Sequence, residues 1–158
     1  MKPNGIRIRP LGPLDLPFAV QIHRDAFGVE AWDASAIADI LAMPGAAGRI
    51  AVDGLLGDHR PLGFSLLLLV ANDAELLTVA VASPARRRRV GTALIEDFLD
   101  IGTEAGAANA FLEVAEDNIP AQRLYGRLGF RQEGVRRDYY RRPGNKRVAA
   151  HLLRRRLP

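Results

Sequence analysis

The chain has 158 residues and a formal net charge of +4, with 48% hydrophobic and 25% charged residues. This is the composition of a globular protein, and the length predicts one domain over residues 1–158. The absence of Cys excludes disulfides, thiolate catalysis and Cys-ligated zinc, and the three His residues are too scattered to suggest a metal site. The longest apolar run, residues 64–71, is too short to cross a bilayer, and the N-terminus lacks the apolar segment of a signal peptide. We therefore expect a soluble, cytoplasmic protein without a membrane partner.

Positive charge is concentrated in the last third of the chain. Residues 123–158 carry 12 basic and two acidic side chains, whereas residues 1–122 carry 10 and 16. A basic block of this kind can bind nucleic acid, anionic ligands or acidic protein surfaces. Twenty of the 22 basic residues are Arg, so the bias is equally consistent with a general preference for Arg over Lys in this chain.

The first half of the chain alternates between strand and helix patterns. Apolar residues at every second position predict strands, and apolar residues at helical spacing predict helices. Asp15 and Asp33 precede the two helical patterns and are expected to be their N-caps. The predicted elements are a strand over residues 6–9, helices over 16–27 and 34–41, and strands over 49–52 and 62–70 joined by a turn region over 53–61.

The second half has the strand and helix order of an α/β or α+β protein. Its sheet is expected to be mixed, with helices on both faces. Gly129 is the expected C-cap of the last helix. The predicted elements are a strand over 76–81, a helix that opens around 92 and ends over 102–106, a strand over 110–114, a helix from Asn118 to Leu128, and strands over 130–138 and 147–157.

Four consecutive arginines, Arg86 to Arg89, lie between a predicted strand and a predicted helix. The N–H groups of a first helical turn lack intrahelical partners, and the helix dipole adds partial positive charge there. Phosphate groups bind at such helix N-termini. The loop therefore predicts a site for a diphosphate ligand.

Several motifs of this sequence resemble those of one protein family, and they have the same mutual spacing as in the family pattern. They run continuously from Glu75 to Tyr140, and the similarity is weak before Arg49. The sequence resembles the GNAT superfamily of acetyl-CoA-dependent N-acetyltransferases, and within it the ribosomal-protein alanine N-acetyltransferase (RimI) type. The residues that carry the resemblance are Val79-Ala80-Val81, Arg86-x-x-Arg89-x-Gly91, Leu112-Glu113-Val114, Asn118, Ala121, Leu124-Tyr125, Leu128-Gly129-Phe130 and Arg136-Arg137-x-Tyr139-Tyr140.

The resemblance implies the fold and the position of the cofactor. It implies a mostly antiparallel sheet of about six to seven strands, splayed between the strand ending at Val81 and the strand containing Glu113. A bulge in the first of these strands would interrupt its pairing and free main-chain groups for the pantetheine arm and the thioester. Asn118 would contact the cofactor, cap its helix, or do both. The implied acetyl-CoA-binding residues are Val79, Ala80, Val81, Arg86, Arg87, Arg88, Arg89, Val90, Gly91, Thr92 and Asn118.

The sequence departs from the family pattern at one position of the diphosphate loop. The pattern is Gln/Arg-x-x-Gly-x-Gly/Ala, and Arg89 stands where its first Gly is expected. A shifted match, starting at Arg88, would need two extra loop residues, so we prefer the unshifted one. Arg is acceptable at this position if its backbone is helical, whereas a left-handed backbone would cost roughly 1 kcal/mol or more.

Acetyl transfer to an amine requires a base, an oxyanion donor and an acid. Glu113 is the only acid on its otherwise apolar strand, and the resemblance makes it the general base rather than a paired structural carboxylate. Tyr125 lies on the inward face of its helix and would protonate the coenzyme A sulfur, although a core Tyr is the alternative. A main-chain amide near Val81 would stabilise the oxyanion. No metal is expected, and without Cys direct transfer in a ternary complex is the simplest route.

The acceptor is expected to be the α-amine of a protein or peptide N-terminus. That branch of the family usually has an acidic pair where this chain has Arg147-Val148, which argues against a strongly basic peptide. A small-molecule amine is the main alternative. A coenzyme-A-binding protein without catalysis and a nucleic-acid-binding module rank lower, because the basic region lacks a recognition helix or an aromatic stacking ladder apart from Tyr139-Tyr140. The sequence does not indicate the oligomeric state.

Overall fold

The computed structural model describes residues 5–54 and 60–158, so part of the predicted 53–61 turn region lies outside the described residues. Seven strands of the described chain form one sheet in the order β1-β2-β3-β4-β5-β7-β6. Neighbouring strands are antiparallel except β4 and β5, which are parallel. The strands are β1 (Ile6–Pro10), β2 (Ala46–Asp53), β3 (Pro61–Val70), β4 (Asp73–Val81), β5 (Asn109–Ala115), β6 (Arg131–Arg142) and β7 (Lys146–Arg156).

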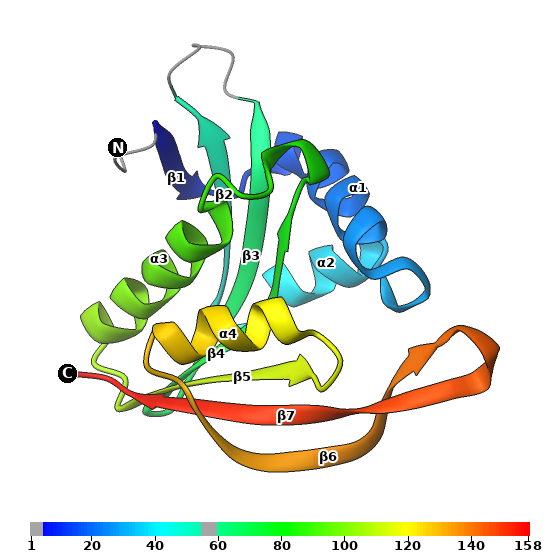
Figure 1. Ribbon diagram of the computed structural model, residues 1–158. Coiled ribbons are helices and arrows are strands. Elements are labelled where there is room, and N and C mark those ends of the chain that lie inside the picture. The colour runs from blue at the N-terminus through cyan, green and yellow to red at the C-terminus, as the bar shows by residue number, and fades with distance from the viewer. Residues whose placement is uncertain (1–4, 55–59) are drawn as a thin grey trace.

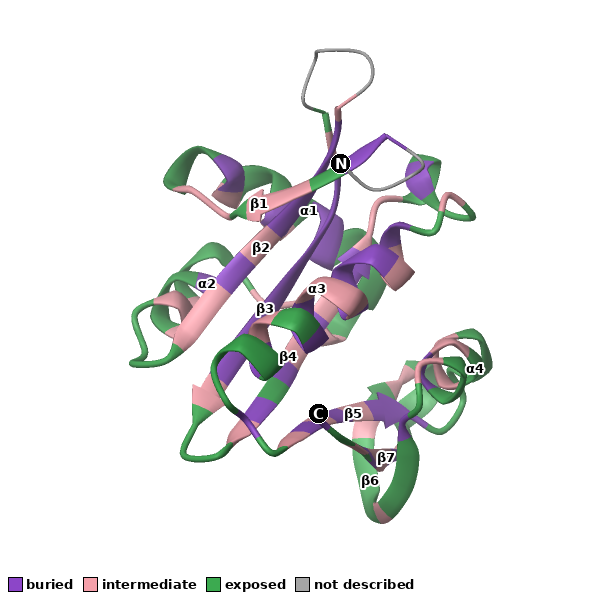
Figure 2. Ribbon diagram, turned by 90° about the vertical axis from the view of Figure 1, so that its left-hand side faces the viewer, coloured by how far each residue is buried: buried purple, intermediate pink, exposed green. Residues whose placement is uncertain are grey.

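Helices cover both faces of this sheet, as the sequence predicted (Figure 1). Two of them, α1 (Leu16–Phe27) and α2 (Ala34–Leu41), pack against one face of β2, β3 and β4. The third, α3 (Val90–Glu104), covers the opposite face. The fourth, α4 (Ile119–Arg127), lies beside β5 and β7. Figure 2 shows the consequence for burial: β3 is buried along most of its length between two helical layers, whereas β6 at the sheet edge is exposed.

The predicted elements are all present, and most differ from the predictions only in their ends. β2 begins at Ala46 and β4 at Asp73, several residues earlier than their apolar patterns indicate. Hydrogen bonding to β3 extends both strands: Ala46 pairs with Leu68, and Asp73 pairs with Val70. Pairing with β3, and not the apolar pattern alone, therefore determines where β2 and β4 begin.

The two predicted N-caps differ in outcome. Asp33 caps α2, because its Oδ1 accepts a hydrogen bond of 2.8 Å from the amide of Ala36. Asp15 does not cap α1 with its side chain. Its carboxylate instead accepts hydrogen bonds from the Gly12 amide at 2.7 Å and from the Arg9 guanidinium at 2.7 and 3.0 Å. The Arg9 hydrogen bonds lower the pKa of Asp15, so this ion pair joins the end of β1 to the start of α1.

None of the helices among the described residues has both the length and the apolar character needed to cross a membrane.

Candidate active site

The parallel pairing of β4 and β5 ends in the middle of both strands. Their register runs from Asp73–Asn109 to Leu76–Leu112. Both strands continue, β4 to Val81 and β5 to Ala115, but without further pairing to each other. The sheet is therefore splayed at this point, and the expectation that the splay lies between the strand ending at Val81 and the strand containing Glu113 is confirmed.

A bulge in β4 lies beside the start of the splay. In the register of β3 with β4, Leu66 pairs with Thr78 and Leu67 pairs with Leu76, so Leu77 is an extra residue. Such a residue changes the side-chain alternation of a strand. Leu77 and Thr78 accordingly face the same side of the sheet: Leu77 contacts the cluster under α1 and α2, and Oγ1 of Thr78 lies 3.1 Å from Nε2 of His23 on α1. The predicted bulge is thus present, four residues before Val81.

Main-chain groups of Val79 and Val81 point into the splay. The amide of Ala82 donates a hydrogen bond of 2.9 Å to the carbonyl of Leu62, so the main chain of Ala82 faces β3. Main-chain polar groups alternate in direction along a strand. Those of Val79 and Val81 therefore face the side from which β5 has diverged, as the sequence prediction requires, while Ala80 is buried under α1.

The arginine loop follows β4 and the short helix η3 (Ser83–Ala85), and it leads to the N-terminus of α3. Its first helical hydrogen bond joins the amide of Ala93 to the carbonyl of Arg89 at 3.0 Å. The amides of Val90, Gly91 and Thr92 precede this bond, so they have no partner within the helix. They form, with the helix dipole, a donor group suited to a diphosphate.

Arg89 has a left-handed backbone, not the helical one that would make Arg acceptable without strain. Its φ is 64° and its ψ is 23°, and Arg87 also has a φ of 64°. A left-handed backbone is the conformation that favours Gly. The conformation supports the unshifted match, because Arg89 has the left-handed backbone that Gly favours, whereas Gly91, the first Gly of the shifted match, lies in α3 and has no positive φ.

The four arginines have different surroundings. The guanidinium of Arg88 pairs with the carboxylate of Asp53 at 3.0 Å, which ties the loop to the end of β2. Arg86, Arg87 and Arg89 are exposed. We therefore assign Arg88 to holding the loop, and the three exposed side chains remain available to a phosphate group. Sequence reasoning did not identify Asp53, since nothing local marks it as the partner of a residue 35 positions away.

Glu113 lies one residue beyond the last β4–β5 pair. Its neighbours Leu112 and Val114 are buried in the core cluster with α3 and α4, so the Glu113 side chain points to the opposite face of β5. It is 24% exposed and its Oε1 lies 3.0 Å from Nη2 of Arg136. The carboxylate is thus half-buried and paired, at the point where the strands part.

Glu75 is a second carboxylate near this position that the sequence analysis did not single out. It pairs with Phe111 in the β4–β5 register, two residues before Glu113 on the same face of β5. Desolvation raises the pKa of Glu75, the charge of Glu113 raises it further, and Arg136 lowers it. Its place opposite β5 follows from strand register, which only the three-dimensional pairing reveals.

Tyr125 is buried on the inward face of α4, as predicted. Its ring packs edge-on against Phe130, with ring centroids 5.9 Å apart. Burial raises the pKa of its hydroxyl, and the nearby Tyr140 raises it further. The hydroxyl therefore stays protonated at neutral pH, as a proton donor requires.

Tyr140 connects the two predicted catalytic residues electrostatically. Burial raises its pKa to about 12, and the charge of Glu113 acts in the same direction. Tyr140 also raises the pKa of Tyr125. The Tyr140 hydroxyl therefore interacts electrostatically with both Glu113 and Tyr125.

Two contacts hold the end of β6 beside this site. The main-chain amide of Arg141 donates a hydrogen bond to Oε1 of Glu30, which ends the short helix η2 (Gly28–Glu30) after α1. The guanidinium of Arg142 forms two hydrogen bonds of 2.7 Å with the carboxylate of Asp117. The segments before α2 and before α4 are therefore both tied to β6.

Asn118 is the N-cap of α4, since its Oδ1 accepts a hydrogen bond of 3.3 Å from the amide of Ala121. Its side chain is exposed, so the cap leaves room for a cofactor contact as well. The C-cap of α4 is Leu128, one residue before the predicted Gly129, and Gly129 follows it with the left-handed φ of 88° that ends the helix.

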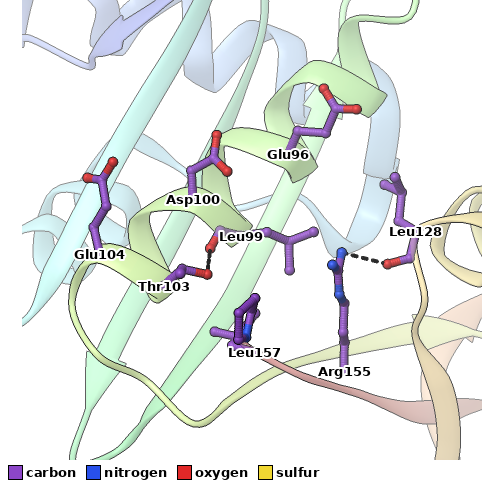
Figure 3. A pocket seen from close by; sticks show the side chains of 9 residues that line it. Glu96, Leu99, Asp100, Thr103, Glu104, Leu128, Arg155 and Leu157 are labelled. Atoms are coloured by element: carbon purple, nitrogen blue, oxygen red, sulfur yellow. Dashed lines mark hydrogen bonds between the residues drawn. The ribbon is translucent and has the colours of Figure 1, made fainter.

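A separate cavity of about 480 Å³ lies at the other end of α3 (Figure 3). One side is acidic, with Glu96, Asp100 and Glu104 on α3, and Arg155 projects from β7 to donate a hydrogen bond of 2.8 Å to the carbonyl of Leu128. None of the predicted site residues lines it, and we assign it no part in the site.

Comparison with known proteins identifies the family. Residues 17–130 match the model of the acetyltransferase (GNAT) family. The chain is 35% identical over 86 residues to the [ribosomal protein bS18]-alanine N-acetyltransferase of Salmonella typhimurium, covering 54% of this chain and 58% of that protein. The chain thus aligns with less than two thirds of the length of this curated relative.

Solved structures agree over nearly the whole chain. The ribosomal-protein-S18-alanine N-acetyltransferase from Escherichia coli superposes with a TM-score of 0.86 at 26% identity, covering 96% of this chain and 94% of that one. Arabidopsis thaliana NAA60 in complex with a bisubstrate analogue gives a TM-score of 0.85 at 24% identity, over 96% and 98%, and shows the same fold. With the family match over residues 17–130, these similarities lead to one conclusion: the chain belongs to the acetyltransferase (GNAT) family.

Proposed function

We propose that this chain is an N-acetyltransferase that transfers acetyl from acetyl-CoA to the α-amine of a protein or peptide N-terminus. The observation that carries the proposal is the end of β4–β5 pairing at Leu76–Leu112, with Glu113 immediately beyond it and the N-terminus of α3 following β4. This arrangement combines an opening in the sheet, a diphosphate-binding helix end and a carboxylate. The similarity to a protein-alanine N-acetyltransferase supports the acceptor class.

The substrates would approach the splay from opposite faces of the sheet. Acetyl-CoA would lie on the side of α3 and α4, with its diphosphate on the amides of Arg87 to Thr92 and its pantetheine arm beside Val79 and Val81. The acceptor would enter on the other face, toward which Glu113 points. The thioester and the amine would then meet where the strands diverge, and this proximity supplies much of the rate enhancement.

We assign each chemical step to one group of the chain. Glu113 would accept a proton from the α-ammonium group, directly or through a water molecule. The amine would then attack the thioester carbonyl, and a main-chain amide near Val81 would stabilise the resulting oxyanion. As the carbon–sulfur bond breaks, Tyr125 would give its proton to the coenzyme A sulfur.

The experiment is a thiol-release assay with acetyl-CoA and a panel of acceptors. The panel contains alanine-starting hexapeptides, the same peptides with an acetylated N-terminus, and small amines. We expect release with the free peptides only, and calorimetry should show acetyl-CoA binding without any acceptor. Thiol release with small amines but not with peptides would show that the acceptor is a small-molecule amine and not a peptide N-terminus. Acetyl-CoA binding without release on any acceptor would indicate a protein that binds the cofactor without catalysis.

A further inference from the structure

Arg136 occupies the side of Glu113 from which an acceptor would approach. It lies on β6, and its guanidinium reaches past β7 to the carboxylate on β5, where Nη2 and Oε1 are 3.0 Å apart. The Arg136 side chain is 52% exposed, and that of Glu113 is 24% exposed. Because water reaches this ion pair, it is a weak contact that another cation can break.

Arg136 has a second contact that does not involve Glu113. Its guanidinium lies over the ring of Tyr139, with Cζ 4.6 Å from the ring centroid, a cation–π contact. The register of β6 with β7 shifts between Arg136 and Tyr140, and Asp138 in this interval has a φ of 50°. The shift leaves Tyr139 outside the regular ladder, beside Arg136. The guanidinium thus has an aromatic partner to retain if it leaves the carboxylate.

The charges around Glu113 favour the approach of a cation. Glu75 from β4 faces the same region and adds a second negative charge. Tyr140 from β6 contributes a hydroxyl that stays neutral at physiological pH, and Glu30 and Arg142 act on Tyr140 from farther along the site. Two carboxylates with one guanidinium leave an excess of negative charge, which attracts a further cation.

An N-terminal α-amine with a pKa of about 8 is mostly an ammonium ion at neutral pH. It must lose a proton before it can attack, and Glu113 is the proposed acceptor of that proton. The ammonium group must therefore reach the carboxylate that Arg136 contacts in the free protein.

We propose that Arg136 is a displaceable partner of Glu113, and that it holds the place which the acceptor's α-ammonium group takes on binding. The inference rests on the proposed function. No covalent bond changes in this exchange: one cation replaces another beside the same carboxylate, and Arg136 keeps its contact with Tyr139. Arg136 competes with the acceptor for Glu113 and takes no part in the proton transfer itself.

The test compares Arg136→Gln, Arg136→Lys and Arg137→Gln with the wild type. Arg137 is exposed on the same strand, so Arg137→Gln removes an equal charge one residue away. Steady-state kinetics with a neutral alanine-starting hexapeptide gives kcat and the acceptor KM. Calorimetry measures binding of the same peptide to the protein saturated with coenzyme A, where no reaction occurs. Melting temperatures confirm that all variants fold.

We expect Arg136→Gln to lower the acceptor KM and Kd about fivefold, equivalent to about 1 kcal/mol, with kcat within about twofold of wild type. Arg136→Lys, which retains a cation, should remain within about twofold of wild type, as should Arg137→Gln. A fall in kcat without a change in acceptor affinity would overturn the inference, because Arg136 would then act in the chemical step. An equal affinity gain in Arg137→Gln would overturn it too, because net charge alone would be the cause.

Failure of the proposed function gives a different result. Wild-type protein would then neither turn over the peptide nor bind it in the presence of coenzyme A, and the inference about Arg136 would fall with it. Wild-type turnover with unchanged affinity in Arg136→Gln would refute only the inference.

Discussion

The guanidinium of Arg88 and the carboxylate of Asp53 lie 3.0 Å apart and join the arginine loop to the end of β2. Asp53 is buried, so the pair fixes one side of the loop against the sheet. The two sequence neighbours of Arg88, Arg87 and Arg89, both have φ values of 64°. The ion pair thus stabilises a loop that contains two residues with a left-handed backbone. The conformational strain of these two residues lowers the stability of the loop.

Two substitutions at Arg89 separate its backbone from its side chain. Arg89→Gly and Arg89→Ala both remove the guanidinium, but only Gly relieves the left-handed strain. We expect the Gly variant to exceed the Ala variant by about 1 kcal/mol in free energy of unfolding, measured by urea denaturation. Acetyl-CoA affinity should stay within about tenfold of wild type in both, because main-chain amides are the proposed diphosphate donors. Severe loss of affinity in both variants would instead assign that contact to the Arg89 side chain.

Gly91 provides the matched test of access to the helix N-terminus. A Cβ at this position would meet Leu124 and Val81 side chains at 3.6 and 3.7 Å, ordinary contact distances. Gly91→Ala should therefore fold normally, whereas Gly91→Phe should place a ring where the diphosphate is proposed to lie. Calorimetry should show acetyl-CoA binding retained in the first variant and abolished in the second. Binding by the Phe variant with wild-type affinity would move the diphosphate elsewhere.

Glu113→Gln tests the proposed base with little change of shape. The amide retains the size of the carboxylate but cannot accept the acceptor's proton at neutral pH. We expect turnover to fall on the order of 10²-fold, with acetyl-CoA affinity nearly unchanged. The measurement is kcat at pH 7.5 together with calorimetry. Wild-type turnover in this variant would remove Glu113 from the role, and Glu75 would be the next carboxylate to test.

The strands and helices could be predicted from the sequence because their signals are local. Alternating Ile residues in β1 and helical spacing in α3 reflect which face of each element is buried. The family motifs predicted that Glu113, Tyr125 and the arginine loop lie near one splay, because these motifs have the mutual spacing of the family pattern.

Contacts between distant segments could not be predicted in this way. Asp15 has the sequence position of an N-cap, but its carboxylate pairs with Arg9 because the fold brings the end of β1 beside it. The Glu113–Arg136 pair depends on β7 lying between β5 and β6, an order that differs from the order along the chain. Which residues form such ion pairs depends on the topology of the sheet, so a local sequence pattern does not predict them.

His23 is a further case of a long-range contact, and it predicts a pH dependence of stability. The imidazole is buried between Phe27 and Trp32. Nδ1 accepts a hydrogen bond of 3.0 Å from the Trp32 amide, so the proton is on Nε2, which lies 3.1 Å from Oγ1 of Thr78. Burial lowers the pKa of His23 from 6.5 to about 4, and the folded protein therefore holds the ring neutral.

Unfolding should take up a proton at His23 between pH 6.5 and 4. The stability contribution is complete above pH 6.5 and is lost as the pH falls toward 4. Between pH 7.5 and 5 the loss should amount to about 2 kcal/mol. Urea unfolding of wild type and His23→Gln at both pH values isolates this residue from the carboxylates. A variant that loses as much stability on acidification as the wild type would contradict the assignment.

Tyr125→Phe tests the proposed acid. The substitution keeps the ring against Phe130 and removes only the hydroxyl, so the melting temperature should change little. We expect kcat to fall by about tenfold or more, while acetyl-CoA affinity stays close to wild type. Tyr140→Phe serves as a comparison, because Tyr140 also lies near Glu113 but has no proposed proton to give. Normal turnover in Tyr125→Phe would rule out its role as the proton donor.

The charge at the end of the β6–β7 hairpin predicts which N-termini are preferred. Arg141 pairs with Arg147 across the two strands, and Arg142 pairs with Lys146. The carboxylate of Asp117 pairs with the Arg142 guanidinium, and Oε1 of Glu30 lies 3.9 Å from Nε of Arg141. Lys146 and Arg147 are exposed on the same hairpin end. This end is tied to η2 by Glu30 and so borders the face toward which Glu113 points. If the α-amine of a peptide is bound at Glu113, the residues that follow it along this border would lie near positive charge.

We therefore expect neutral or acidic N-terminal peptides to be acetylated ahead of arginine-rich ones. The test is competition between hexapeptides that share an N-terminal Ala and differ only in charge at the second and third positions. At low salt the acidic peptide should lead the basic one about fivefold in kcat/KM, and the lead should shrink as added salt screens the charges. Arg147→Glu should reduce or reverse the preference, because it replaces a side chain that repels a basic peptide with one that attracts it. A clear lead for the basic peptide in the wild type would refute the charge argument, whatever the outcome for the α-amine itself.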